Sequence, residues 1–381
     1  MELDIIEIAK ETFKDKELIL EELPNNKVKI WYKNERMYRS IGGTDPRPFV
    51  LSKSMELDEG FAEAIGLYLG DGKTTKNDMR HLDFASKDYD IVIFMLNFFT
   101  KKFLVNLHNM TITVKHKTGD KNSILEKWSK LLKIPKSKFK ISYVSRNRYD
   151  TVSIQINSAV LRKMFDEIVH ISLPIIKENK LLRIAFLKGY FAAEGTVGYN
   201  ENENYLNYIG FSYNPKTEKW LRNYCISCLN KENIQSVFRE RKGNRSDIII
   251  SGWRNYWKLL SIKIFDGCER KKKRFFEIFL SRNIYCNLNE EFRQLLFNSL
   301  DMSQREIAKI INSHQGNVCR TIKGKHLLNV NQIKTLIGYT NLSIGNFIEN
   351  TKAVRVGNGK NILDRNFIET VFKINQETLC S

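Results

Sequence analysis

Two nine-residue stretches carry the residues with the clearest capacity for chemistry. AIGLYLGDG spans residues 64–72 and LKGYFAAEG spans residues 187–195. Both have glycine in third place, a small residue in seventh, an acid in eighth and glycine in ninth. The acids, Asp71 and Glu194, each end an apolar stretch of helical composition, where the helix dipole disfavours a carboxylate. The same acid at the same place in both stretches indicates a shared role.

A pair of neighbouring carboxylates repels unless a cation lies between them. Hard oxygen ligands suit Mg²⁺, which keeps most of its waters and takes one or two carboxylates together with phosphate oxygens. Such a pair therefore fits metal-assisted hydrolysis of a phosphodiester bond. The alternative is that each acid is a solvated residue at the end of a helix.

The segments that follow the two stretches also resemble each other. FASKDYDIVIFMLNFFTKKF from Phe84 and FSYNPKTEKWLRNYCISCLN from Phe211 both indicate a strand end, a polar corner and an amphipathic helix. Residues 151–165 and 246–260 both alternate like a strand and then become helical. This self-similarity predicts an α+β fold with two copies of one α-β-β-α-β-β-α unit between about residues 58 and 280.

The small residues of the two stretches indicate how the copies meet. Gly66 and Gly70 are four residues apart on one helix face, and Gly189 and Ala193 are their counterparts. Small residues at this spacing let two helix backbones approach closely. We expect these four positions to form a helix interface, so that the two acids end side by side.

Charge and composition indicate a nucleic-acid partner. The 381-residue chain has 62 Lys and Arg against 43 Asp and Glu, a net charge of +19. An excess this large favours a polyanion, with a membrane surface as the weaker alternative. The chain contains no run of 18 apolar residues, so we expect no membrane span. The mixed N-terminus resembles neither a signal peptide nor a transit peptide. We expect a cytoplasmic, nucleoid-associated or organellar protein with reduced cysteines, and a CISC sequence at 225–228 that packs in a helix core.

The paired nonamers resemble the motif helices of LAGLIDADG (dodecapeptide, DOD-type) homing endonucleases, in the monomeric form that has two motifs in one chain. The resemblance covers about residues 58–280. It implies two pseudosymmetric repeats whose saddle-shaped antiparallel sheets straddle the major groove of a long double-stranded DNA site. It also implies cleavage of both strands with Mg²⁺ or Mn²⁺ bound by Asp71 and Glu194, with further ligation by the carbonyls of Gly70 and Ala193.

The family also implies a basic residue near each scissile phosphate. The candidates are Lys177 and Lys180 in the first repeat and Lys271 and Lys272 in the second. Because the chain is rich in lysine, a solvated face is the alternative for each of them.

We expect the DNA-reading strands at about 73–86 and 195–212, with partners near 110–117, 140–156, 234–241 and 245–251. The predicted DNA-binding residues on these segments are basic: Lys73, Arg80, His81, Lys115, Lys117, Arg146, Arg148, Arg239, Arg241 and Arg245. The strand TVGYNENENYLNYIGF is instead rich in Asn, Tyr and Glu, so it either reads bases or forms a loop.

SQREIAKIINSHQGNVCRTIKG, residues 303–324, predicts a helix-turn-helix. Its second helix would expose Gln315, Asn317, Arg320 and Lys323 to DNA; an ordinary helical hairpin is the alternative.

The predicted domains are an N-terminal extension with short strands and a linker (1–57), the first repeat (58–180), the second repeat (181–282), the helix-turn-helix domain (288–350) and a tail (351–381).

Two other functions fit the same features. Regulators similar to WhiA also join a LAGLIDADG fold to a helix-turn-helix, and the domain order of this chain resembles theirs. These regulators bind DNA without cutting it and have lost the acids. Intron maturases, which bind RNA, use the same fold. The presence of both Asp71 and Glu194 favours the endonuclease over the regulator.

Overall fold

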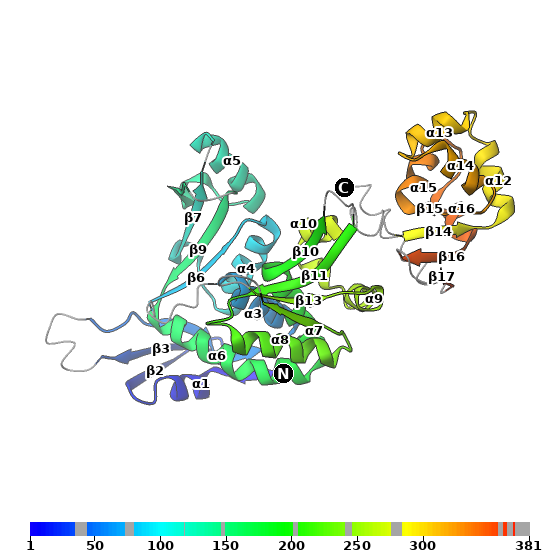
Figure 1. Ribbon diagram of the computed structural model, residues 1–381. Helices are drawn as coiled ribbons and strands as arrows, with labels where there is room; N and C mark the ends of the chain where they lie inside the picture. Colours follow the sequence, from blue (N-terminus) through cyan, green and yellow to red (C-terminus); the bar gives the residue numbers. More distant parts are fainter. Residues whose placement is uncertain are drawn as a thin grey trace. The chain divides into compact units, whose positions relative to one another are not determined.

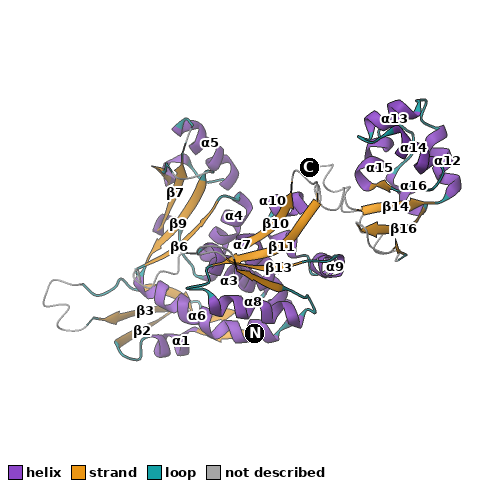
Figure 2. Ribbon diagram, viewed as in Figure 1, coloured by secondary structure: helices purple, strands orange, loops and turns teal. Residues whose placement is uncertain are grey.

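The computed structural model describes residues 1–34, 44–72, 80–117, 119–145, 149–200, 205–240, 246–275, 284–356, 361–363 and 369. These residues form two compact units, drawn in Figure 1. The first unit comprises 1–196, 210–250 and 254–269, and the second comprises 197–209, 251–253 and 270–381. Helices and antiparallel sheets dominate the structure (Figure 2), which confirms the predicted α+β class. No helix among the described residues is long and apolar enough to span a bilayer.

The first repeat is built on one four-stranded sheet, in the order β6-β9-β7-β8. Its elements follow one another as α3 (Glu59–Asp71), β6 (His81–Ser86), α4 (Tyr89–Lys102), β7 (Met110–His116), α5 (Lys121–Leu132), β8 (Phe139–Tyr143), β9 (Thr151–Asn157) and α6 (Ala159–Glu178). Strand β9 pairs antiparallel with both β6 and β7, whereas β8 pairs parallel with β7.

The second repeat has the simpler order that the sequence predicts. Its elements are α7 (Lys180–Glu194), β10 (Gly195–Asn200), β11 (Tyr205–Tyr213), α8 (Lys219–Lys231), β12 (Val237–Glu240), β13 (Ser246–Ile250) and α9 (Trp253–Ser261), followed by α10 (Glu269–Arg274). Its sheet order is β10-β11-β13-β12. By position and pairing, β11, β13 and β12 correspond to β6, β9 and β7, so α5 and β8 form an insertion that only the first repeat contains.

Aromatic side chains fill the core of the first repeat. Phe98 and Phe99 on α4 pack with Phe61, Phe103 and Phe165, all at ring-centroid separations of 6.5 Å or less. Strands β6, β7 and β9 turn alternate apolar residues toward this core, as expected for a sheet with one face buried. The core therefore fixes which face of the sheet is left open.

The N-terminal residues form a separate three-stranded sheet in the order β2-β3-β4, beside a two-stranded pair of β1 and β5. The elements are β1 (Glu2–Asp4), α1 (Ile5–Thr12), β2 (Glu17–Leu23), β3 (Lys27–Lys33), β4 (Phe49–Ser52) and β5 (Ser54–Glu56). Strand β3 pairs antiparallel with both β2 and β4. Asn25 and Asn26 adopt left-handed geometry in the turn between β2 and β3, and residues 35–43, between β3 and β4, lie outside the described residues.

The C-terminal part of the second unit combines helices with a sheet in the order β15-β14-β16-β17. Its elements are β14 (Ile284–Leu288), α12 (Glu290–Asn298), α13 (Gln304–Ile310), α14 (Gln315–Ile322), β15 (Leu328–Asn329), α15 (Val330–Ile337), α16 (Ile344–Glu349), β16 (Thr351–Val356) and β17 (Asn361–Ile362). The strands before and after the helices pair with each other. Residues 351–356, assigned to the tail from sequence, thus belong to this sheet.

Candidate metal centre and nucleic-acid interface

Helices α3 and α7 pack against each other (Figure 1). Their backbones meet at the third position of each nonamer. A Cβ atom added to Gly66 would lie 2.2 Å from the carbonyl oxygen of Phe186, and one added to Gly189 would lie 2.0 Å from that of Glu63. No side chain fits at such distances. Glycine is required at both positions because each helix occupies the space that a side chain on the other would need.

The acid-bearing ends of these helices also meet. A Cβ atom on Gly70 would lie 2.4 Å from the Cβ of Ala193 and 3.2 Å from the Cγ of Glu194. Gly70 directly precedes Asp71, so the last turn of α3, which carries one acid, lies beside the side chain of the other. Both acids are partly exposed to solvent.

Each helix ends in the same way immediately after its acid. Gly72 and Gly195 cap the two helices in extended conformation. Gly72 forms a bridge to Phe84 on β6, and Gly195 is the first residue of β10. An added Cβ would lie 2.3 Å from the carbonyl oxygen of Tyr68 in the first repeat and 2.2 Å from that of Phe191 in the second. The two acids therefore occupy equivalent positions between a packed helix and a sheet.

An ion pair joins the two helices about two turns before the acids. The Nζ of Lys188 lies 2.5 Å from Oε2 of Glu63. Burial raises the pKa of Glu63 although Lys188 acts in the opposite direction. Eight residues of helix separate Glu63 from Asp71, about 12 Å, so this pair stabilises the interface rather than the acid site.

A second buried network holds α3 against α6. Nη1 of Arg162 donates to the hydroxyl of Tyr68 at 2.5 Å, and its Nε donates to Asp166 at 3.0 Å. Burial raises the pKa of both Tyr68 and Asp166. Tyr68 lies one turn before Asp71, and the ring of Tyr68 lies against Gly72, the residue that follows the acid. The network therefore positions the end of α3.

The same residues line a groove of about 860 Å³ between α3, α6 and α8. Its walls are mostly apolar, with Leu173 and Trp220 among them, and Lys177 also lines it. The CISC cysteines do not contribute. Cys225 and Cys228 are fully buried within α8, and burial raises the pKa of both thiols, to about 11 for Cys228.

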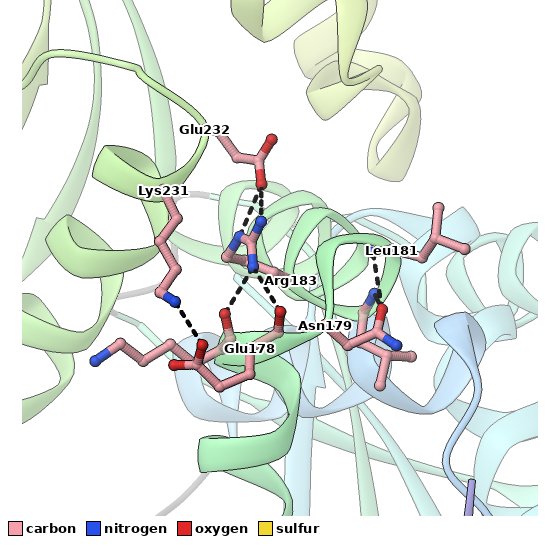
Figure 3. Close-up of polar contacts among 8 residues, drawn as sticks. Glu178, Asn179, Leu181, Arg183, Lys231 and Glu232 are labelled. Carbon is pink, nitrogen blue, oxygen red and sulfur yellow. Dashed lines mark hydrogen bonds and ion pairs between the residues drawn. The ribbon is translucent and has the colours of Figure 1, made fainter.

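Polar contacts hold the beginning of α7 against the ends of α6 and α8 (Figure 3). The Asn179 side chain caps α7, and Arg183 donates to the carbonyls of Lys177 and Glu178 at the end of α6. Arg183 also forms a buried ion pair with Glu232. This junction holds α6, α7 and α8 in fixed relation.

The structure places Lys177 in the last turn of α6 and Lys180 at the start of α7. Lys180 is the first residue of α7 and Glu194 the last, about 21 Å apart along a helix of this length. Because α3 and α7 end together, Lys180 lies at the opposite end of α7 from both acids; a role of Lys177 near a scissile phosphate stays a prediction. Lys271 and Lys272 lie on α10 in the second unit, where Lys271 is buried.

The acid pair fits a hard divalent cation. Asp71 and Glu194 carry hard carboxylate oxygens, and carbonyl groups in the last turn of a helix point past its end, which suits the oxygens of Gly70 and Ala193 as further ligands. No group of three or more His, Cys, Asp or Glu within the described ranges could hold a metal by itself. A cation here would take its remaining ligands from water or a phosphate.

The first sheet presents an open, polar face opposite its aromatic core. The half-exposed side chains on this face are His81, Asp83, Thr111, Thr113, Lys115, Thr151, Ser153 and Gln155. Strand pairing aligns them in rows: Asp83 and Thr111 both face Gln155, and Lys115 faces Thr151. Such donors and acceptors can contact base edges in a groove.

The other predicted DNA-binding residues are only partly placed. Arg80 and Lys117 are exposed beside β6 and β7, and Arg239 is exposed on β12. Five predicted residues lie outside the described residues: Lys73, Arg146, Arg148, Arg241 and Arg245. The sequence pattern did not single out Lys140 on β8 or the exposed Tyr143 and Tyr149, which the alternation in KFKISYV and the neighbouring basic residues could have indicated.

The predicted helix-turn-helix segment contains α13 and α14, which pack on each other. Asn312 adopts left-handed geometry between them, with φ of 47°. Gln315, Arg320 and Lys323 are exposed at α14, whereas Asn317 is half-buried and its Nδ2 donates to the hydroxyl of Ser313 at 3.4 Å. Three of the four predicted contact residues thus face solvent.

No family model and no curated protein matches this chain. Among solved structures, variants of the homing endonuclease I-DmoI are similar over 54% of this chain and 94% of theirs, with 15% identity and a TM-score of 0.33. Full-length DUF199/WhiA from Thermatoga maritima is similar over 74% and 93%, with 15% identity and a TM-score of 0.33. I-DmoI structures include complexes with its target DNA and Mn. Identities of 15% and TM-scores of 0.33 do not assign a function to this chain.

Proposed function

We propose that this protein is a site-specific, metal-dependent DNA endonuclease of the LAGLIDADG homing type. The observation that carries the proposal is the meeting of two equivalent helix ends, each with a carboxylate as its last residue, at Gly70 and Ala193–Glu194. Packing this close fixes both acids relative to each other, as a shared metal centre requires.

The two acids and the carbonyls at the helix ends would together bind the metal. Asp71 and Glu194 would hold Mg²⁺ or Mn²⁺ through hard oxygens, with the carbonyls of Gly70 and Ala193 as further ligands. The bound cations would supply an activated water and offset the charge that develops on the phosphate. The backbone would hold these carboxylates beside the sheets, since Gly72 bridges to Phe84 on β6 and Gly195 begins β10.

The open polar sheet face supports DNA as the substrate. Its rows of Thr, Ser, Gln, Asp and Lys side chains carry donors and acceptors suited to base edges. We include the exposed residues of α14, Gln315, Arg320 and Lys323, as a second DNA contact, and a monomer as the active form. The net charge of +19 supports phosphate contacts in addition.

A regulator that binds DNA without cutting it is the second candidate. The helical segment of α13 and α14 after the two repeats favours it. The two acids favour the endonuclease, because a protein that only binds DNA gains nothing from carboxylates that repel phosphates.

Substitution of the acids separates the two candidates. We expect Asp71→Asn and Glu194→Gln each to reduce Mg²⁺-dependent cutting by a factor of about 10³ or more while DNA affinity changes little, because each removes a charged ligand at nearly constant volume. Single-turnover cleavage and binding in Ca²⁺ measure the two effects. Unchanged cutting in either variant would exclude the proposed metal centre.

A further inference from the structure

The insertion of the first repeat, residues 117–150, carries a disproportionate share of the positive charge. It contains ten Lys and Arg against three Asp and Glu, a net charge of +7 out of +19 for the chain. In the second repeat, β12 and β13 are separated only by residues 241–245. The segment therefore adds charge to one side of the two-repeat arrangement only.

The fold of the insertion turns its lysines outward. Helix α5 buries Ile124, Trp128 and Leu132 on one stripe, against α4 and β8. The remaining surface of the segment carries exposed lysines at positions 117, 121, 127, 130, 133, 136, 138 and 140. With its apolar stripe buried, α5 has no exposed apolar face with which to enter a membrane.

The acids of the insertion neutralise little of this charge. Glu126 pairs with Lys136 at 3.2 Å, and Asp150 lies 3.7 Å from Lys127. Asp120 accepts from the backbone N–H of Ser123 and caps α5. Within the described part of the chain, Lys130, Lys133 and Lys140 have no carboxylate partner.

The charge is continuous with the open face of the first sheet. The parallel pairing of β8 with β7 sets Lys140 opposite Thr113 and Ser142 opposite Lys115. Both β7 residues belong to the polar face. The insertion thus extends that face by one strand and adds a cationic edge to it.

A cleft of about 560 Å³ lies where the insertion meets the loop between α4 and β7. Lys27, His108 and Lys138 line it together with Asn106, and its lining includes no Asp or Glu. The Nζ of Lys138 lies 2.6 Å from Nδ1 of His108. Two lysines and an imidazole without a carboxylate suit a phosphate group.

We propose that the exposed lysines of residues 119–145 form a sequence-independent clamp on the phosphates of duplex DNA that flanks the site read by the sheets. The inference rests on the DNA binding in the proposed function but not on cleavage. It assigns an asymmetric footprint to a protein whose repeats are otherwise related, with the longer flank on the side of the first repeat.

The test compares two double variants that remove equal charge. Lys130→Gln/Lys133→Gln changes the insertion, and Lys216→Gln/Lys219→Gln changes exposed lysines before and at the start of α8. The probe is a random-sequence duplex several helical turns long, with single-stranded RNA of the same length in parallel. Affinity is measured over a range of salt concentrations, and circular dichroism verifies folding.

We predict that the magnitude of the slope of log affinity against log salt concentration falls by about 1.8 in the insertion variant, because each phosphate that is no longer neutralised removes about 0.9. The slope should be unchanged in the control variant. Equal weakening in both variants, no weakening in either, or weakening confined to RNA would overturn it. If the wild-type protein binds DNA but never cuts it, the proposed endonuclease fails while this test still decides the role of the insertion.

Discussion

Gly66 and Gly60 lie in the same helix but in different surroundings. A Cβ atom on Gly66 would meet the backbone of α7 at 2.2 Å, whereas one on Gly60 would have its nearest contact at 3.5 Å, with Asp58. The two positions therefore separate the intrinsic effect of glycine in a helix from the effect of helix contact.

We predict that Gly66→Ala destabilises the protein by about 1–3 kcal/mol, the range for overpacking, because the oxygen it meets belongs to a helix backbone. Gly60→Ala should be neutral or stabilising by up to about 1 kcal/mol. Chemical denaturation measures both. Equal stability of the two variants would mean that α3 and α7 do not pack as closely as described.

Among single residues, the sequence indicates those that recur in both nonamers but not those that occur in only one repeat. The glycines and acids could be found because the same types recur at positions three, seven, eight and nine of both nonamers. The Tyr68–Arg162–Asp166 network joins residues 94 positions apart on two elements. No local spacing indicates such a pair, since only the packing of α3 on α6 creates it.

The junction of α6, α7 and α8 contains two ion pairs that differ in burial. Arg183 and Glu232 have side chains exposed by only 7% and 6%, whereas Lys231 and Glu178 are exposed by 37% and 69%. Arg183 additionally bonds two carbonyls at the end of α6. The buried pair therefore determines the direction in which α7 leaves α6.

We predict that Arg183→Ala destabilises the protein by about 3–5 kcal/mol, because it leaves the Glu232 charge buried without a partner. The double variant Arg183→Met/Glu232→Met should recover part of this loss. Lys231→Ala is the control and should have little effect, since exposed pairs contribute little. Similar destabilisation in Arg183→Ala and Lys231→Ala would show that burial does not distinguish the pairs.

Among the elements, the order of helices and strands in the second repeat could be read from alternation and helical periodicity. The insertion of α5 and β8 could not, because it has no counterpart with which to be aligned. Strand β2 is also hard to predict from sequence, because it contains three glutamates, which are uncommon in strands. Lys29 and Lys33 on β3, and Lys53 after β4, pair with these acids.

For the whole molecule, composition indicates a partner class and the repeats indicate a reaction. The charge of +19 favours a polyanion, and the convergence of two helix ends on one acid pair favours metal-dependent hydrolysis over binding alone. Only the structure reveals that charge is concentrated beside the first sheet, because β8 joins that sheet in parallel at its edge.

The most direct measurement is cleavage of a randomised DNA library by the full-length protein with Mg²⁺, followed by sequencing of the ends, with Asp71→Asn as the control. We predict double-strand breaks at one discrete sequence that are absent in the control. Fragments that are bound and enriched but never cut, or cutting that persists in Asp71→Asn, would contradict it.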